Sequence, residues 1–295
     1  MYRIAHITDL HIKYDNPEPN LGKFRQLVDD ALSSGCDHIV LTGDIADYAD
    51  ERDYEYIRAL LLEFDLLSSH KLSVIPGNHD IFGGPSPELP FYLYPVHCRK
   101  LNYDQKLTQF YDSFIETFDY TLTGENSFLP YAKVLNEQCA VIGINSVAKY
   151  SQYMNPLGTN GYVSKSQFET IKNLLANESI KDKIKLVLIH HHFNKPGESK
   201  AHPEHSLWLK SEQEKMRLHQ KSELFELFKK KKVNAVLHGH THITDTYARK
   251  GSFFINSSGC SFPFTETGER QYHIMEIGNP SAGEKPFNLI KKTIA

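Results

Sequence analysis

Short polar segments rich in histidine and aspartate recur along this chain, and each directly follows an apolar run. The segments are Asp9-Leu10-His11, Gly43-Asp44, Gly77-Asn78-His79-Asp80, His190-His191-His192 and Gly239-His240-Thr241-His242. Carboxylate, amide and imidazole groups are the side chains that bind metal ions and transfer protons in proteins. A single histidine or aspartate after an apolar run means little, but a converging set of this size is hard to explain as packing.

The candidate metal ligands are two carboxylates, one amide oxygen and four imidazoles, from Asp9, His11, Asp44, Asn78, His190, His240 and His242. Seven donors are too many for one tetrahedral zinc ion. They suit two divalent ions about 3.5–4 Å apart that share one carboxylate. Because none of the donors is a cysteine, the metals indicated are Mn, Fe, Zn or Ni. In Asp9-Leu10-His11 and His240-Thr241-His242, residues two apart can both face the site from an extended segment.

The turn that contains Asn78, His79 and Asp80 combines a neutral oxygen ligand with a residue that can carry a proton. His79 offers a proton or a positive charge, and Asp80 can hold the imidazole in one orientation. This combination is typical of general acid–base catalysis. In the histidine cluster, His190 is the candidate ligand because it comes first after the apolar run, and His191 is the alternative.

The periodicity of the apolar residues predicts the elements that would position these segments. Strands are predicted at 2–8, 38–42, 72–75, 140–145, 185–189 and 234–237, and helices at 24–32, 57–64, 107–118, 164–175 and about 216–232. The first part has the order βαβαβ, which implies parallel strands with helices outside, and the tail is expected to form short antiparallel strands. Since ligands bind in the crevice at the carboxyl ends of such strands, all five segments are expected to meet at one rim.

Residues 81–131 interrupt the alternation of predicted strands and helices, and they are interpreted as an aromatic-rich insertion that carries one helix. Its aromatic side chains could wall a substrate pocket, or they could pack the insertion onto the body of the protein. No repeat, linker or low-complexity segment divides the 295 residues, so a single domain over 1–295 is predicted.

Composition and charge narrow the class of protein. The formal net charge of -3 argues against an extended nucleic-acid footprint, which would need a basic stripe. No apolar run reaches transmembrane length, and the predicted strand at the N-terminus leaves no room for a signal peptide. The four cysteines have no paired spacing, which is typical of reduced thiols. A cytoplasmic location is therefore expected.

The polar segments, taken together and in this order, resemble those of the calcineurin-like metallophosphoesterase superfamily. The matching residues are Asp9-x-His11, Gly43-Asp44-x-x-Asp47, Gly77-Asn78-His79-Asp80, His190 and Gly239-His240-x-His242. The resemblance implies an α/β fold, a four-layer αββα sandwich of two mixed sheets with a dinuclear metal site at the strand edge. The segments are most similar to those of bacterial class III cyclic-nucleotide and glycerophosphodiester phosphodiesterases.

The resemblance also implies a role for each candidate residue. One metal would be held by Asp9, His11, Asp44 and His242, and the other by Asp44, Asn78, His190 and His240, with Asp44 bridging. A metal-bridging hydroxide would attack the phosphorus atom. His79, oriented by Asp80, would be the general acid or would stabilise the transition state. Many relatives have a proline after the strand-end histidine, where this chain has His191, so His191 stays an alternative to His190.

The predicted function is metal-dependent hydrolysis of a small phosphodiester of the cyclic-nucleotide or glycerophosphodiester type. Two other hydrolases stay open: a phosphomonoesterase, and a pyrophosphatase for a nucleotide-linked lipid precursor, to which the aromatic insertion would offer an apolar groove. Some members of this fold are metal-free binding scaffolds, which is the alternative from another class. Those proteins have lost ligands, whereas every expected ligand is present here.

Overall fold

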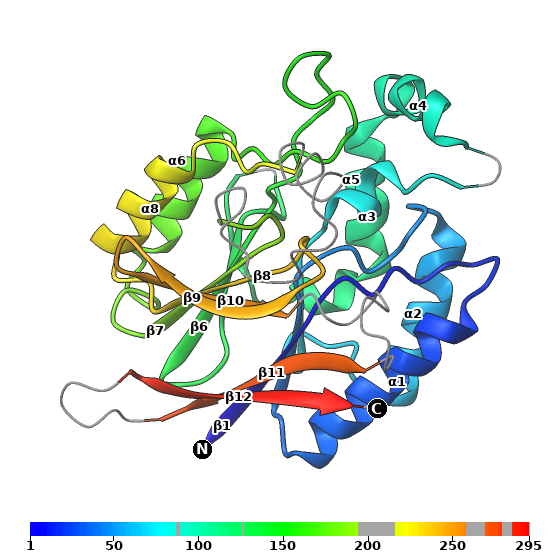
Figure 1. Ribbon diagram of the computed structural model, residues 1–295. Helices are drawn as coiled ribbons and strands as arrows, with labels where there is room; N and C mark the ends of the chain where they lie inside the picture. The colour runs from blue at the N-terminus through cyan, green and yellow to red at the C-terminus, as the bar shows by residue number, and fades with distance from the viewer. Residues whose placement is uncertain (87–88, 126, 194–215, 258–268, 279–284, 295) are drawn as a thin grey trace.

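Two β-sheets lie face to face in the computed structural model, and helices cover the outer surface of each sheet (Figure 1). The structure describes residues 1–86, 89–125, 127–193, 216–257, 269–278 and 285–294. Within these residues, one sheet has the strand order β12-β11-β1-β2-β3 and the other the order β4-β5-β6-β7-β8-β10-β9. The predicted α/β fold, with two mixed sheets between layers of helices, is confirmed.

The first sheet is formed by β1 (Tyr2–Ile7), β2 (His38–Leu41), β3 (Leu72–Val74), β11 (Arg270–Ile277) and β12 (Phe287–Ile294). The second is formed by β4 (Leu122–Thr123), β5 (Tyr131–Val134), β6 (Cys139–Ile144), β7 (Ile184–Ile189), β8 (Ala235–His238), β9 (Thr244–Arg249) and β10 (Ser252–Ser257). The helices are α1 (Glu18–Ser33), α2 (Glu51–Glu63), α3 (Asn78–Phe82), α4 (Tyr94–Lys100), α5 (Tyr103–Ser113), α6 (Lys165–Leu174) and α8 (Lys221–Lys230), with 3-10 turns η1 (Phe91–Leu93) and η2 (Ile115–Phe118).

The amino-terminal half has the predicted βαβαβ order, because β1, β2 and β3 are parallel and α1 and α2 connect them. The tail is more varied than predicted. Strand β11 pairs antiparallel with β1, whereas β10 pairs parallel with β8 in the other sheet. Helix α1 also begins earlier than predicted, at Glu18, because Pro19 falls in its first turn, where proline is tolerated.

The central strands of the second sheet are buried on both faces, as their continuous apolar runs predict. Successive side chains point to opposite faces of a strand. Leu186 and Leu188 of β7 accordingly join the core between the sheets, while Val187 and Ile189 pack toward α6 and α8. Two apolar layers therefore hold β7 in place, which fixes the position of the residues that follow it.

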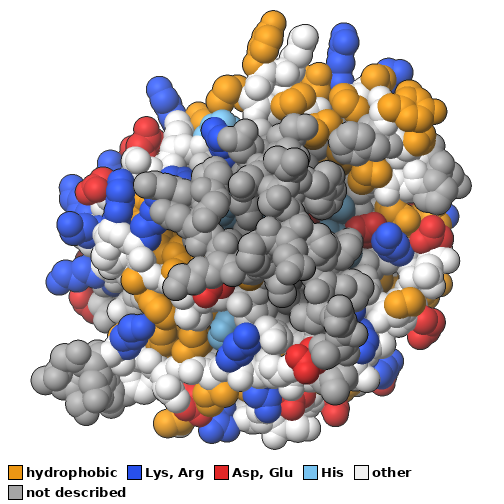
Figure 2. Space-filling view, viewed as in Figure 1, with side chains coloured by type: hydrophobic (Ala, Val, Ile, Leu, Met, Phe, Trp, Pro, Cys, Tyr) orange, Lys and Arg blue, Asp and Glu red, His pale blue; other side chains and the backbone are white. Residues whose placement is uncertain are grey.

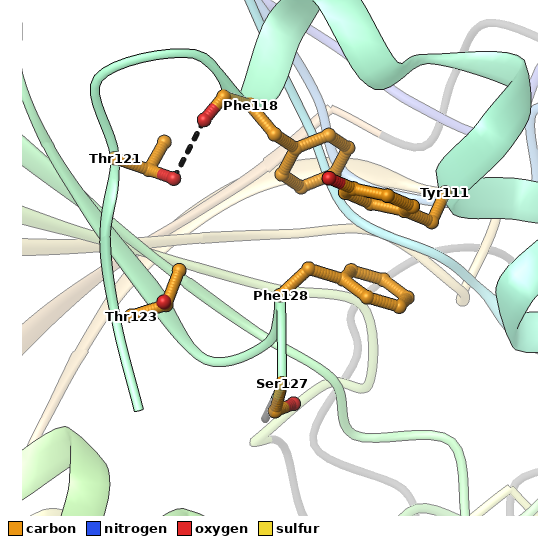
Figure 3. Close-up of a pocket in the computed structure, with 6 residues that line it drawn as sticks. All are labelled: Tyr111, Phe118, Thr121, Thr123, Ser127 and Phe128. Atoms are coloured by element: carbon orange, nitrogen blue, oxygen red, sulfur yellow. Dashed lines mark hydrogen bonds between the residues drawn. The ribbon is translucent and has the colours of Figure 1, made fainter. Parts of the chain in front are cut away.

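The described part of the insertion at 81–131 holds the helices α4 and α5, so the prediction of one helix was wrong. Helix α4 has Pro95 in its first turn, where proline is tolerated. A sequence interpretation that treats every proline as a helix breaker therefore misses this helix. Three aromatic rings of the insertion line a cavity of about 350 Å³ (Figure 3). The rings of Tyr111 and Phe128 stack there at 4.3 Å. Most other aromatic residues of the insertion that the structure describes pack into apolar clusters.

The cavity of the insertion lies away from the carboxyl ends of the strands. Its wall includes Phe118 of η2. The buried Lys133 ammonium donates hydrogen bonds to the carbonyl groups of Thr117, also in η2, and of Leu72, the first residue of β3. The cavity is therefore close to the start of β3, whereas the polar segments follow the strand ends.

Charged side chains of both signs are interspersed among the described residues on the face in Figure 2, without a stripe of lysine and arginine. In the described part of the chain, no helix has both the length and the apolar character needed to span a bilayer. Cys36, Cys98 and Cys139 are buried free thiols, and Cys260 lies outside the described residues.

Candidate metal centre

All seven predicted ligands come together, and they come from both sheets. Asp9 and His11 follow β1, Asp44 follows β2, and Asn78 follows β3 in the five-stranded sheet. His190 follows β7, and His240 and His242 follow β8 in the seven-stranded sheet. The site therefore lies where the carboxyl ends of strands from two facing sheets meet, and not along the rim of one sheet.

The backbone at the site is strained. Five of the seven candidate ligands have a positive φ: Asp9 (56°), His11 (46°), Asp44 (50°), His240 (76°) and His242 (53°). Residues other than glycine rarely adopt this conformation, and such residues cluster at functional sites. The expectation that residues two apart face the site from an extended segment was wrong, because left-handed turns aim these side chains instead.

The first group of donors surrounds one side of Asp44. His11 Nε2 lies 3.2 Å from His242 Nε2 and 3.7 Å from Asp44 Oδ2. Asp9 Oδ1 lies 3.6 Å from His242 Nε2. The backbone N–H of His240 donates to both carboxylate oxygens of Asp9, at 3.0 and 3.2 Å. These four side chains match the predicted set for one metal.

The second group surrounds His190 Nε2. This atom lies 3.3 Å from Asp44 Oδ2, 3.2 Å from Asn78 Oδ1 and 3.1 Å from His240 Nδ1. The other ring nitrogen of His190 contacts the carbonyl oxygen of Thr42 at 2.9 Å. This contact leaves Nε2 directed at the site, so the second group contains the four side chains predicted for the other metal.

His191 is engaged elsewhere. Its Nδ1 lies 2.8 Å from Ser146 Oγ, and its Nε2 lies 3.2 Å from the carbonyl oxygen of Thr159. Both ring nitrogens therefore have partners outside the donor groups. Of the two histidines left open by the sequence, His190 has the geometry of a ligand.

The spacing of the donor atoms fits two metal ions. Two ligands about 2.05 Å from one tetrahedral ion lie about 3.3 Å apart. The contacts in the two groups range from 3.1 to 3.7 Å. In two of these contacts, one imidazole nitrogen faces another. Two such nitrogens need a proton or a cation between their lone pairs. Asp44 belongs to both groups. The residues present therefore fit a pair of ions with Asp44 between them.

Two glycines allow the strands of the site to approach closely. A side chain at Gly77 would collide with the Asp44 carboxylate and would lie 2.8 Å from His190 Cε1. Gly43 has φ of 97°, and a side chain there would lie 2.6 Å from His190 Nδ1. Asp44 and His190 can thus meet across the two sheets only because both neighbouring positions lack a side chain.

Asp44 is the electrostatic centre of the site. Burial raises the pKa of its carboxyl, but the imidazoles of His190, His79 and His11 outweigh burial and hold that pKa well below its usual range. Burial lowers the pKa of His190, yet the Asp44 carboxylate raises it to about 9. A buried carboxylate among imidazoles is a site that favours positive charge.

Asp80 does not orient His79, so the predicted contact between them was wrong. Asp80 Oδ1 accepts hydrogen bonds from the backbone N–H groups of Ile45 and Ala46, and Oδ2 accepts one from Gly77. Residues adjacent in a helix face different directions, and Asp80 turns back toward the start of α3, where it accepts from the backbone N–H of the N-cap residue Gly77. Burial and the nearby Asp44 carboxylate raise the pKa of Asp80 to about 7, against these three donors.

We expect Asp80→Ala to destabilise the fold by about 3–5 kcal/mol, because it leaves buried backbone N–H groups without an acceptor. Urea unfolding of the metal-free protein measures this. Asp80→Asn keeps one acceptor oxygen and should cost about 1–2 kcal/mol. A stable Asp80→Ala protein with an altered pH profile of turnover would restore the orienting role.

Asp47 is the partner of His79, and the sequence interpretation missed this role. Its Oδ1 lies 3.1 Å from His79 Nδ1 and 2.8 Å from His11 Nδ1. The sequence feature that could have indicated this role is the three-residue spacing between Asp44 and Asp47 in the motif. Asp47 thus positions two imidazoles at once, one in the first donor group and one beside it.

His79 carries a proton at neutral pH because of its raised pKa. Burial lowers its pKa, but the Asp44 and Asp47 carboxylates raise it to about 9. Its side chain is 23% exposed, so a bound molecule can reach it. Lys13 Nζ lies 3.2 Å from Asp47 Oδ2. Burial lowers the pKa of Lys13, but the ion pair with Asp47 outweighs burial and raises it, so the side chain is cationic at neutral pH.

Comparisons with known proteins found a matching family model and a curated relative. A family model described as calcineurin-like phosphoesterase matches residues 2–244. A probable cyclic nucleotide phosphodiesterase from Coxiella burnetii is 33% identical over 82 residues, which cover 26% of this chain and 32% of that protein. The chain therefore matches about a third of the length of this curated relative.

Two solved structures have a similar fold. A dimetal phosphatase from Danio rerio aligns with a TM-score of 0.59 at 11% identity, covering 93% of this chain and 92% of that chain. A purple acid phosphatase from yellow lupin aligns with a TM-score of 0.56 at 13% identity, covering 93% of this chain and 49% of that chain. At these identities the likeness concerns the fold and not the substrate.

Proposed function

We propose, since this chain belongs to the calcineurin-like phosphoesterase family, that it hydrolyses a small phosphodiester at a centre of two divalent metal ions. The observation that carries the proposal is the pair of donor groups that share Asp44, with ligand spacings of 3.1 to 3.7 Å. We also propose that residues 1–295 form one domain, because strands of both sheets contribute to the core between them.

The proposed ligands of one ion are Asp9, His11, Asp44 and His242, and those of the other are Asp44, Asn78, His190 and His240. Two bound cations would acidify a water molecule and neutralise negative charge on the phosphoryl oxygens. The chain itself prepares the site for this task. Asp47 orients the His11 ring through Nδ1, so that Nε2 faces the site. The Thr42 carbonyl does the same for His190.

His79 is proposed to protonate the leaving oxygen. Its Nδ1 is held by the Asp47 carboxylate and by the Asp47 carbonyl oxygen, at 3.1 and 3.2 Å. This leaves Nε2 as the nitrogen available to a substrate. With a pKa raised to about 9, the ring carries a proton at neutral pH. Asp47 therefore takes the positioning role that the sequence assigned to Asp80.

The preference for diesters is supported by the motif resemblance to class III phosphodiesterases and by the relative from Coxiella burnetii, a probable cyclic nucleotide phosphodiesterase. A phosphomonoesterase is the second candidate, because two metal ions held by these donor groups would serve a monoester by the same chemistry. The aromatic cavity of the insertion lies near the start of β3, which does not favour a role as the groove of a lipid-precursor pyrophosphatase.

Metal content tests the proposal. We expect the purified protein to bind two transition-metal ions per chain and to lose hydrolysis of bis(p-nitrophenyl) phosphate when a chelator removes them. Adding Mn²⁺ should restore activity. Fewer than one bound ion per chain, unrepaired by Mn²⁺, would instead favour a metal-free binding scaffold.

The substrate type is tested with a Mn²⁺-supplemented panel of a linear diester, a cyclic nucleotide, a monoester and a nucleotide diphosphate ester. The diester proposal expects the highest kcat/KM for one of the first two compounds. A higher kcat/KM for the monoester would favour the second candidate.

A further inference from the structure

One lysine of the described residues forms an ion pair with a carboxylate of the site. Among the ion pairs between described residues, Lys13 is the lysine or arginine that reaches a site carboxylate, at 3.2 Å from Asp47 Oδ2. Its ammonium also lies over the ring of Tyr48, 5.3 Å from the centroid. A carboxylate and an aromatic face thus hold this flexible side chain at the rim of the site.

Lys13 has donor capacity to spare. An ammonium group carries three N–H donors, and the contacts with the Asp47 carboxylate and the Tyr48 hydroxyl use two of them. The Lys13 side chain is 39% exposed, while the Asp47 side chain is 8% exposed. The charge therefore faces the solvent while it contacts the carboxylate that positions His79.

The location of Lys13 indicates which part of a substrate it would meet. The Asp47 carboxylate binds His79 through Oδ1 and Lys13 through Oδ2. His79 is proposed to protonate the leaving oxygen, so the side of the site next to His79 is the leaving-group side. Because one carboxylate contacts both residues, the Lys13 ammonium belongs to that side of the site.

We propose that Lys13 is a specificity-determining residue that binds a second anionic group, a phosphate or a carboxylate, on the leaving portion of the substrate. This inference rests on the proposed function and deepens it. The preferred substrates are then phosphoesters whose leaving group carries its own negative charge. Phosphoesters of neutral alcohols lack this contact.

Two phosphonates that cannot be hydrolysed test the inference without turnover. 3-Phosphonopropionate and propylphosphonate have the same length and differ in whether the far end is a carboxylate or a methyl group. We expect the Mn²⁺-loaded wild-type protein to bind 3-phosphonopropionate about tenfold more tightly in titration calorimetry, as one charge-assisted hydrogen bond at a half-exposed site allows. Lys13→Met should remove this preference, and Lys13→Arg should keep most of it.

The control variant is Lys230→Met, at the exposed end of α8, which should keep the tenfold preference. Equal binding of the two phosphonates by the wild type would overturn the inference, as would an unchanged preference in Lys13→Met. If Lys13 had a purely structural role, its replacement would weaken the binding of both phosphonates equally. That result would also contradict the inference. Binding of neither phosphonate by the Mn²⁺-loaded wild type would overturn the proposed function, and the inference with it.

Discussion

Replacing Asp44 with asparagine is expected to lower turnover by about a thousandfold or more and to remove both ions. Metal-assisted charge stabilisation is worth several kcal/mol, and each 1.36 kcal/mol is about a factor of ten in rate. Asp44 Oδ2 lies within 3.7 Å of a donor in each group, so both proposed ions depend on it. An amide keeps the shape of this side chain but loses the charge that attracts cations.

Metal analysis and steady-state kinetics of Asp44→Asn, side by side, measure this effect. We expect fewer than one ion per chain and no recovery of turnover at high Mn²⁺. Asp104→Asn is the matched control, because that carboxylate forms an exposed ion pair with Lys149. An Asp44→Asn protein that keeps two ions and more than a tenth of the activity would remove Asp44 from the bridging role.

His79→Ala is expected to keep both ions and to lose turnover by about a hundredfold to ten-thousandfold, the usual range for a general acid. The loss should depend on the leaving group. It should be small for p-nitrophenol, which leaves without a proton, and large for an alkyl alcohol of high pKa. The turnover of Asp47→Asn should lie between those of the wild type and His79→Ala, because the substitution weakens the hydrogen bond that orients the His79 ring.

The pH profile provides a second measurement of the same role. A general acid is active in its protonated form, so turnover of an alkyl diester should fall as the pH rises through the pKa of His79, near 9. This limb should be absent in His79→Ala. Normal turnover of an alkyl diester by His79→Ala would take the residue out of the acid role.

The layers of the fold could be predicted because a strand that is buried on both faces is apolar along its whole length, and such a run is visible in the sequence. Apolar runs such as the one in β7 have no other common explanation at that length. Strand β5 was missed for a reason that only the tertiary structure supplies. Its Lys133 looks like a surface residue, but its ammonium is buried and bonded to two backbone carbonyls. Local patterns do not contain such a distant partner.

The set of candidate ligands could be predicted because every one of them follows a strand, where the chain has little freedom. The contacts around them could not be predicted in the same way. Asp80 and Asp47 are both carboxylates close to His79 or Asp44 in sequence, and only the direction of the α3 turn decides which one meets the imidazole. Nothing in the sequence indicated that Lys13 contacts the site, because a lone lysine after a motif is common on any protein surface.

The contact of Asp44 with His190 at 3.3 Å joins one sheet to the other, and this has a consequence for the stability of the folded protein. Neither sheet alone holds a complete set of donors, so cations would bind only when the two halves of the sandwich are docked. A ligand that binds the folded form alone stabilises it by RT ln(1 + [L]/Kd). Bound cations would then hold the two halves of the sandwich together, in addition to serving the reaction.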